Sequence, residues 1–212
     1  MSQDQAPRRR ADARRNVDAL LDAARAVFAT SGVDAPAKEI TDRAGVGVGT
    51  MYRHFPQRAH LVKAVVESNI DAVADAAPAL SAAHEPAEAL TAWIRRFADL
   101  LATKRGLASA LHSGDPAFEG LPAYFLERLG PALAGLLDAA VAAGTVRADL
   151  SAEDLLHAIT QLCRPVPGLP PEHNERILAV FLDGLRRDAT QGVNHQGASG
   201  GSRGAAAWPS RA

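Results

Sequence analysis

The sequence predicts an all-α fold. Apolar residues recur at the i, i+3, i+4, i+7 spacing of amphipathic helices through most of the 212 residues, and no segment shows the strict alternation of a half-buried strand. Glycines and prolines stand between these periodic segments, where helices begin and end. Hydrophobic residues make up 47% and charged residues 22% of the chain, which is typical of a globular protein with a substantial core.

Four helices are expected in the first third of the chain, because apolar residues with helical spacing are bounded there by helix-ending glycines and prolines. Gly32 and Gly45 are expected to end the first and second helices, and Pro78 is expected to end the fourth. The expected ranges are residues 14–31, 36–44, 48–55 and 57–77.

The rest of the chain is expected to be helical as well. A well-patterned helix follows the loop that contains Pro86 and stops near Gly106, and a capping box formed by Ser151 and Asp154 opens a later one. Four further segments complete the pattern: a short helix over residues 107–113, a restart at Asp115–Pro116, a stretch over residues 124–143 that Gly130–Pro131 should kink or split, and a last helix carrying Ile177 to Leu185.

Charge is distributed unevenly along the chain, although the net charge is only −1. Residues 1–60 carry ten Arg and Lys against seven Asp and Glu, whereas the remainder carries thirteen against seventeen. Five arginines lie between Arg8 and Arg15. A basic end on an acidic body suggests contact with a polyanion at that end, with a solvated, disordered arm as the alternative.

Cysteine usage and hydropathy indicate a cytoplasmic protein. Cys163 is the only cysteine, so no internal disulfide can form and we infer a reducing compartment. The most apolar stretch is interrupted by Pro131 and Asp138, so no membrane contact is expected. The N-terminal arginines are not followed by an apolar segment, and a signal peptide is therefore not expected.

The stretch "AGVGVGTMYRHF", residues 44–55, places a glycine-rich turn directly before a short helix. A helix, a tight turn and a second helix are typical of the helix-turn-helix motif, whose second helix enters the DNA major groove. At about 100° per residue, Met51 and Phe55 share the inner face of that helix. The outer arc then carries donor-rich side chains around a glycine: Gly49, Thr50, Tyr52, Arg53 and, at its margin, His54.

This outer arc suits a surface that binds phosphates and bases. An arginine such as Arg53 can bind guanine O6 and N7 together, whereas Thr, Tyr and His typically donate to phosphates. Taken singly, Tyr52 could be a core aromatic residue and Arg53 a solvated charge, but their placement on one arc favours DNA. A phosphate-binding loop is disfavoured, because no strand precedes the glycines and no GK[ST] follows them.

The run "FATSGVDAPAKEITDRAGVGVGTMYRHFPQRAHLVKAV" resembles the N-terminal domain of the TetR (tetracycline-repressor) transcription regulators. Its "AGV-x-x-GT-x-Y-x-x-F" core is highly specific to that family, and the resemblance covers about residues 14–75. It implies an N-terminal three-helix helix-turn-helix DNA-binding domain and a C-terminal helical bundle for ligand binding and dimerisation. The segment "AGTVRADLSAEDLL" and its surrounding helices are similar to SbtR-like regulators.

Domain boundaries follow from this organisation. Residues 1–13 are expected to form a basic disordered arm, and residues 14–60 the DNA-binding domain, with its motif at about residues 36–55. Residues 61–189 are expected to form the ligand-binding and dimerisation domain. The Gly/Ser/Ala-rich residues 190–212 lack periodicity and are expected to be a disordered tail.

The resemblance also implies roles for individual residues. Lys38 would contact a phosphate or a base, Arg58 would contact phosphate, and Arg53 would be the base reader. Gly47 stands where the family often has a Ser or Thr N-cap, so the reading helix is expected to lack that cap. Val48 and Gly49 would face the major groove of the DNA. Thr50, Tyr52 and His54 would bind the DNA backbone.

A small-molecule pocket is expected between helices of the C-terminal body, where helical bundles usually hold their ligands. Only Trp93 and Phe97 share an obvious helix face, one turn apart. Each candidate is by itself more often an ordinary core or surface residue. The candidate lining residues are Trp93, Phe97, Tyr124 and Phe125, with Arg96, His112, His157 or Gln161 as polar partners.

The last two helices carry more apolar surface than a terminal hairpin is expected to hide alone. A symmetric four-helix interface between two copies would bury it, and the resemblance implies such a homodimer. Two reading helices related by a two-fold axis would also cover enough base pairs of a palindrome for specificity. The apolar residues concerned are Leu155, Ile159, Leu162, Ile177, Leu178, Phe181 and Leu185.

Neither a catalytic site nor a cofactor is expected. Cys163 and His157 lie six residues apart and point about 240° away from each other on a helix, so they cannot form a nucleophile–base pair there. His173 follows a proline-rich loop and stays open as a partner. No metal-binding spacing of Cys and His is present, and a structural cysteine is the favoured interpretation.

Together these features predict a ligand-responsive transcriptional regulator that binds double-stranded DNA. We expect a repressor that binds a palindromic operator as a homodimer and is released by an unknown small-molecule effector, with activation as the near alternative. A DNA-binding protein that acts in chromosome organisation, without ligand-controlled transcription, is the alternative from another class.

Overall fold

The computed structural model describes residues 5–103, 107–111, 113–170 and 172–186, and within these ranges it is built from helices, with one isolated β-bridge between Val146 and Arg186. The predicted all-α fold is confirmed. The elements are α1 (Gln5–Ser31), α2 (Ala37–Ala44), α3 (Val48–His54), α4 (Arg58–Ala74), α5 (Ala76–Ala83), α6 (Pro86–Thr103), α7 (Ala108–Leu111), the 3₁₀-helix η2 (Pro116–Phe118), α8 (Leu121–Ala142), α9 (Ala152–Leu162) and α10 (Glu172–Leu185).

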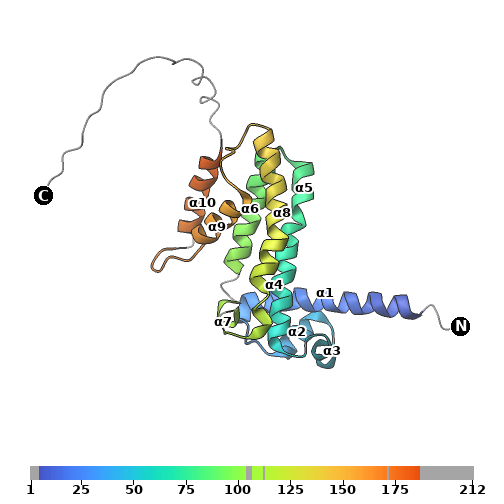
Figure 1. The fold of residues 1–212 in the computed structure, drawn as a ribbon. Helices are drawn as coiled ribbons and strands as arrows, with labels where there is room; N and C mark the ends of the chain where they lie inside the picture. Colours follow the sequence, from blue (N-terminus) through green and yellow to red (C-terminus); the bar gives the residue numbers. More distant parts are fainter. Residues whose placement is uncertain (1–4, 104–106, 112, 171, 187–212) are drawn as a thin grey trace, which may run out of the picture.

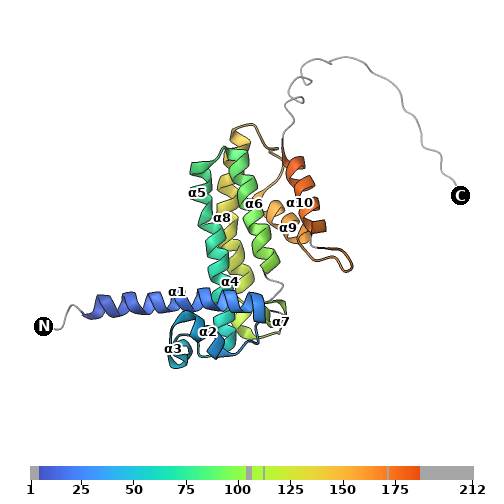
Figure 2. The ribbon, with the colours of Figure 1, turned by 180° about the vertical axis from the view of Figure 1, so that it is seen from behind.

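The helices form two groups that α4 connects. Helices α1, α2 and α3 gather at one end of the molecule, and α4 runs from this end into a bundle with α5, α6 and α8 (Figure 1). Helix α9 packs on the side of that bundle, against α8 and α6, and α10 packs against α9 (Figure 2). The N-terminal part of α1 projects beyond the three-helix group on the side where α3 lies (Figures 1 and 2).

The three-helix group has its own buried contacts. Leu20 of α1, Ile40 of α2 and Met51 of α3 are at most 3% exposed, so each helix contributes a side chain to one core. Gly45 ends α2 with φ 68°, and its N–H donates to the Asp42 carbonyl at 3.3 Å. A residue without a Cβ is favoured in this left-handed conformation, which turns the chain from α2 toward α3.

Replacing Gly45 with alanine is expected to lower the free energy of unfolding by about 1–2 kcal/mol, because an L-residue pays that cost in the left-handed region. The space around Gly45 is open, since an added Cβ would meet nothing within 4 Å, so the cost is in the backbone alone. Gly47 is a matched control, because its surroundings are equally open but its φ is −73°. Urea denaturation should show a loss for Gly45→Ala and little change for Gly47→Ala; equal losses would contradict the assignment.

Three predictions about helix limits need correction. Helix α1 begins at Gln5, so residues 5–13 of the expected disordered arm are helical; alanine and arginine are good helix formers, and Pro7 lies in the first turn, where proline is tolerated. Pro78 does not end α4, since the break lies at Asp75 and Pro78 sits in the first turn of α5. Pro131 lies inside a continuous α8, which is not split there. Residues 1–4 and the expected tail at 190–212 lie outside the described residues.

Other local predictions are confirmed. Ser151 and Asp154 form the capping box at the start of α9, with the Asp154 N–H donating to Ser151 Oγ at 3.1 Å and the Ser151 N–H donating to Asp154 Oδ2 at 2.9 Å. Gly144 follows α8 with φ 71°, the left-handed conformation that is common for a glycine after a helix. Among the described residues, the helices are too short or too polar for any of them to cross a membrane.

The core of the C-terminal bundle centres on α6. Trp93, Ile94 and Phe97 are fully buried, and the Trp93 indole N–H donates to the Val73 carbonyl at 2.9 Å. Val73 lies in the last turn of α4, where carbonyl groups lack partners within their own helix. The indole therefore ties the end of the connecting helix to the middle of the bundle.

Candidate nucleic-acid interface

Helix α3 is anchored by its inner face and presents its outer face to solvent. Met51 is 3% exposed and Phe55, directly after the helix, is 9% exposed, as the spacing predicted. Gly47 provides no side-chain cap, and its carbonyl instead accepts the N–H groups of Thr50 at 2.8 Å and Met51 at 3.2 Å. A short helix held this way is fixed by the core behind it and leaves its opposite side free for a partner.

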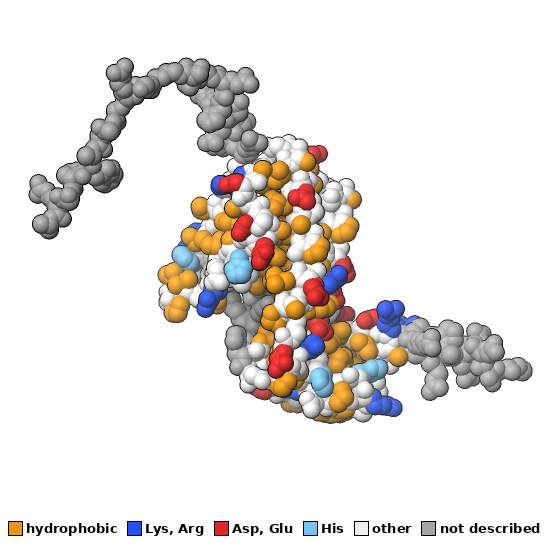
Figure 3. All heavy atoms as spheres, in the orientation of Figure 1, with side chains coloured by type: hydrophobic (Ala, Val, Ile, Leu, Met, Phe, Trp, Pro, Cys, Tyr) orange, Lys and Arg blue, Asp and Glu red, His pale blue; other side chains and the backbone are white. Residues whose placement is uncertain are grey.

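The outer arc holds the residues that the sequence placed there. Tyr52 is 49% exposed, Arg53, His54 and Gly49 are exposed, and Thr50 is half-buried. Val48, the first residue of the helix, is 40% exposed. On the face shown in Figure 3, basic and histidine side chains lie at the end that carries α1 and α3, and basic, acidic and histidine side chains are also spread over the rest of this face. Contact of these residues with DNA stays a prediction.

The Arg53 side chain lies back along its own helix. Its Nε donates to the Gly49 carbonyl at 3.1 Å, and its Nη2 donates to Thr50 Oγ1 at 3.3 Å. These exposed hydrogen bonds are weak, so the side chain can exchange them for contacts with a base edge.

Lys38 lies in the first turn of α2 and is well exposed. Its ammonium group pairs with Asp42 Oδ2 at 2.6 Å, one turn along the same helix. An exposed pair of this kind contributes at most about 1 kcal/mol, so it does not prevent Lys38 from binding a phosphate.

Arg58 is bound within the fold, and the predicted contact of this residue with a phosphate stays a prediction. Its Nε donates to the Val33 carbonyl at 2.5 Å and its Nη2 donates to the Ala35 carbonyl, while its guanidinium lies 5.4 Å from the centre of the Phe28 ring. These contacts fasten the start of α4 to the loop between α1 and α2. The guanidinium's donors point into the protein, so no phosphate is needed to explain the residue.

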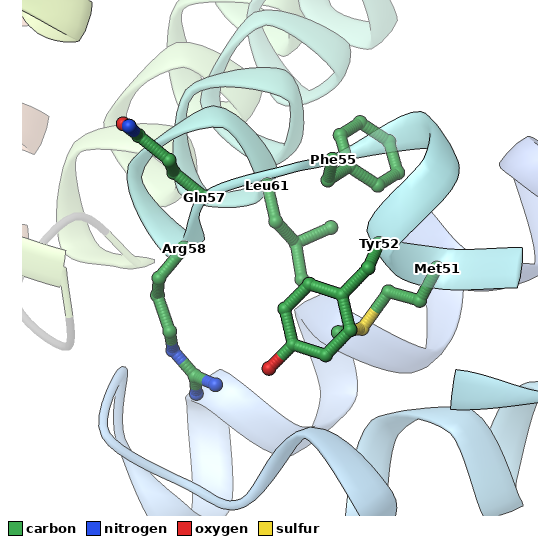
Figure 4. Close-up of a pocket in the computed structure, with 6 residues that line it drawn as sticks. All are labelled: Met51, Tyr52, Phe55, Gln57, Arg58 and Leu61. Carbon is green, nitrogen blue, oxygen red and sulfur yellow. The ribbon is translucent and has the colours of Figure 1, made fainter. Parts of the chain in front are cut away.

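A small pocket lies between α3 and the start of α4, lined by Met51, Tyr52, Phe55, Gln57, Arg58 and Leu61 (Figure 4). The Tyr52 ring points from α3 toward Arg58, with Leu61 behind them, whereas Gln57 points away (Figure 4). Because Arg58 fixes one wall, the pocket holds the Tyr52 ring at the edge of the exposed face. Tyr52 is therefore supported on one side by the pocket and is 49% exposed on the other.

The aromatic residues predicted to line a ligand pocket pack against one another. The Phe97 ring lies 5.8 Å from Trp93 and 5.6 Å from Phe125, centre to centre. Trp93 and Phe97 are fully buried, and Phe125 is half-buried. Their contact with a ligand stays a prediction. Of the proposed polar partners, Arg96, His157 and Gln161 are exposed, so they do not face this cluster, and His112 lies outside the described residues.

Tyr124 belongs to a polar link between α4 and α8. Its hydroxyl donates to Asp71 Oδ1 at 2.7 Å, and burial, followed by this hydrogen bond to Asp71, raises the pKa of Tyr124 to about 12. Arg128 donates to the same Asp71 oxygen at 2.6 Å and to Asp75 Oδ1 at 2.8 Å. Sequence reasoning missed Asp71, Asp75 and Arg128, because no local pattern connects residues more than 50 positions apart.

The same turn of α4 is also bound to α1. Arg25 Nε donates to Asn69 Oδ1 at 2.6 Å, and Arg25 Nη2 donates to Ser68 Oγ at 3.1 Å. Asn69 and Asp71 therefore connect one short stretch of α4 to the three-helix group on one side and to the bundle on the other.

The predicted dimer surface is smaller than the sequence suggested. Leu155, Ile159, Leu178 and Leu185 turn into the core of their own protomer and are at most 7% exposed, because α9 packs on the bundle and α10 packs against α9. The solvent face of α10 instead carries Val180, at 70% exposed, and Ile177, at 38%. Leu162 and Phe181 are half-buried.

Cys163 and His157 lie in different environments on α9. Cys163 is half-buried at the end of α9, whereas His157 is exposed on that helix, as their spacing predicted. No group of three or more His, Cys, Asp or Glu side chains in the described ranges is arranged to hold a metal ion.

Two family models match separate parts of the sequence. Residues 20–65 match the model for bacterial regulatory proteins of the tetR family, and residues 85–187 match the model for the C-terminal domain of SbtR-like transcriptional regulators. A comparison with curated proteins gives no match.

Solved structures show the same similarity. A TetR transcriptional regulator from Streptomyces coelicolor is 38% identical, with a TM-score of 0.68 over 82% of this chain and 99% of that one. A TetR regulatory protein from Mycobacterium vanbaalenii is 39% identical, with a TM-score of 0.66 over 84% and 99% of the two chains. RolR in complex with resorcinol shares the fold at 22% identity, with a TM-score of 0.53 over 82% and 89%.

Proposed function

This chain belongs to the TetR family of transcriptional regulators, with an SbtR-like C-terminal domain, and we propose that it is a repressor that binds a palindromic operator as a homodimer and is released by a small molecule. One observation carries the proposal: α3 is anchored by Met51 and Phe55 and exposes its donor-rich arc. The family is one of regulators, which argues against an enzyme and against a purely chromosome-organising role. In this proposal the protein acts in the cytoplasm and needs no cofactor.

The exposed arc of α3 reads the operator in this proposal. Val48 and Gly49 face the groove, and Arg53 leaves Gly49 and Thr50 to bind a guanine. Lys38, at the start of α2, exchanges Asp42 for a phosphate. Three donors on the flanks of α3 hold the DNA backbone: Thr50, Tyr52 and His54.

The N-terminal part of α1 adds backbone contacts beside the reading helix. Arg14 and Arg15 are exposed, and α1 projects past the three-helix group on the side of α3 (Figure 1). Because this segment is helical, the contacts would lie at a fixed distance from α3. Because these arginines would neutralise DNA phosphates and release counterions, the affinity for DNA would depend strongly on salt concentration.

Two copies pair through α9 and α10, so that their reading helices address successive major grooves. The exposed Val180 and Ile177 on α10 support this proposal, since a symmetric partner would remove them from water. We place the DNA-binding domain at residues 14–60, extended by the helical start of α1, and the ligand-binding and dimerisation domain at residues 61–189.

A small molecule bound in the C-terminal domain would release the operator. RolR binds resorcinol in the same fold, which supports a ligand-binding role, and we place the ligand near Trp93, Phe97, Tyr124 and Phe125. Movement there passes through Tyr124 and Asp71 to α4, and through Asn69 to α1. The ligand controls DNA affinity only if it binds the released conformation more tightly than the DNA-bound one.

Replacing Arg53 with alanine is expected to relax base preference at one position of each half-site, at a cost of about 1–3 kcal/mol for the preferred base. Replacing Thr50 with alanine should weaken binding to all sequences nearly equally, because its hydroxyl contacts the backbone. Kd values for the operator and its single-base variants check both outcomes. Arg95→Ala on α6 is the control, since Arg95 is exposed far from α3. An unchanged preference profile for Arg53→Ala would show that another residue reads the base.

A further inference from the structure

We propose that Val48 reads the 5-methyl group of a thymine, and so makes the operator prefer an A·T pair at one fixed position of each half-site. The inference rests on the proposed function, because it requires α3 to enter the major groove. It adds a specificity-determining residue and the base that this residue recognises.

Val48 is apolar and exposed where the neighbouring apolar residues are buried. It is 40% exposed at the first position of α3, whereas Met51 and Phe55 are 3% and 9% exposed. The core behind the helix therefore does not account for a valine here. An exposed valine on a surface of donors gains stability only when a partner covers its methyl groups.

Both neighbours of Val48 are glycines in open space. An added Cβ at Gly47 or Gly49 would meet nothing within 4 Å, so bare backbone flanks the valine on each side. Neither sequence neighbour of Val48 therefore carries a side chain that could cover its exposed part. A base edge can approach that exposed part.

The chemistry of the major groove selects the partner. Base edges there present hydrogen-bond donors and acceptors, and the thymine 5-methyl group is their apolar feature. Valine has no polar side-chain atom, so covering a donor or acceptor with it leaves that group unpaired at a cost. Residues at the N-terminal end of a recognition helix contact base edges, and Val48 occupies that end of α3.

Thymine-to-deoxyuridine replacement removes the 5-methyl group and keeps every hydrogen-bonding group, so it tests the inference at single-methyl resolution. Each thymine of the selected operator is replaced in turn, and Kd is measured for the wild type and for Val48→Ala. We expect one position per half-site where the wild type loses about fourfold in affinity, and about fifteenfold when both half-sites are replaced. Val48→Ala should be insensitive at that position.

Two controls separate this result from general weakening. Val166→Ala makes the same chemical change at a residue that is 43% exposed in the loop before α10, and it should keep the wild-type profile. Arg53→Ala should keep the deoxyuridine effect while changing preference at another base. If Val48→Ala retains the wild-type sensitivity, or if no deoxyuridine position affects the wild type, the inference is wrong while the regulator assignment stands. If the wild type selects no operator, the proposed function fails and the inference fails with it.

Discussion

Replacing Arg58 with alanine is expected to lower the free energy of unfolding by about 2–4 kcal/mol, because the change removes charged hydrogen bonds to two backbone carbonyls and a cation–π contact. The carbonyls are those of Val33 and Ala35, and the ring is that of Phe28. All three lie in or beside the loop between α1 and α2. Urea denaturation of the purified protein measures the effect. The loss of stability is calculated from the shift of the urea midpoint, provided that the dependence of the unfolding free energy on urea concentration is unchanged.

The alternative role of Arg58 as a phosphate ligand predicts a different result. If Arg58 bound a phosphate, its removal would reduce the magnitude of the slope of log K for DNA binding against log salt concentration by about one. The free energy of unfolding would change little. We expect the opposite: a large loss of stability and an unchanged slope for the protein that remains folded. Arg53→Ala serves as the reciprocal control, because that exposed arginine should alter DNA binding without altering the urea midpoint.

Replacing Trp93 with alanine is expected to lower the free energy of unfolding by about 3–5 kcal/mol, the usual cost of removing a large buried aromatic side chain. Trp93 is fully buried against Phe97, and its indole N–H donates to the Val73 carbonyl at 2.9 Å. Thermal or urea unfolding measures the loss.

Trp93→Phe separates the two contributions of this residue. Phenylalanine keeps most of the apolar volume and loses the donor to Val73, so a loss of about 1–3 kcal/mol is expected. A loss below about 1 kcal/mol for Trp93→Ala would mean that the side chain is not part of the core, and the connection between α4 and α6 would need another explanation.

Sequence reasoning succeeded where the determining interactions are local. Gly45 sets the turn because its own backbone needs φ 68°, and Met51 and Phe55 share a face because they lie one turn apart. The capping box at Ser151 and Asp154 depends on groups three residues apart. Signals of this kind predicted the three-helix group, the all-α fold and the exposure of the α3 arc.

The features that the sequence did not predict are interactions between distant parts of the chain and helix limits that depend on tertiary packing. Arg58 finds its carbonyl partners 23 and 25 residues earlier, and Asp71 meets Arg128 57 residues later. No periodicity in one sequence reports such pairs. The burial of Leu178 and Leu185 likewise depends on how α10 packs within the protomer, against α9, and it leaves less exposed apolar surface for a partner than the sequence suggested.

Charge patterning predicted the basic end but not its conformation. The arginines near the N-terminus suggested a solvated arm, whereas the chain is helical from Gln5. The alanines between the arginines have high helix propensity, which the prediction from charge alone did not take into account. The basic segment is thus an extension of α1.

The central claim is that α3 of a dimer reads a palindrome, and selection of bound fragments from randomised DNA tests it most directly. The wild type and Tyr52→Ala are compared by sequencing the fragments that each retains. We predict a palindromic motif for the wild type that Tyr52→Ala does not recover, although the variant stays folded because Tyr52 is 49% exposed. The absence of any enriched motif at low salt with folded wild-type protein, or the same motif for both proteins, would contradict the account.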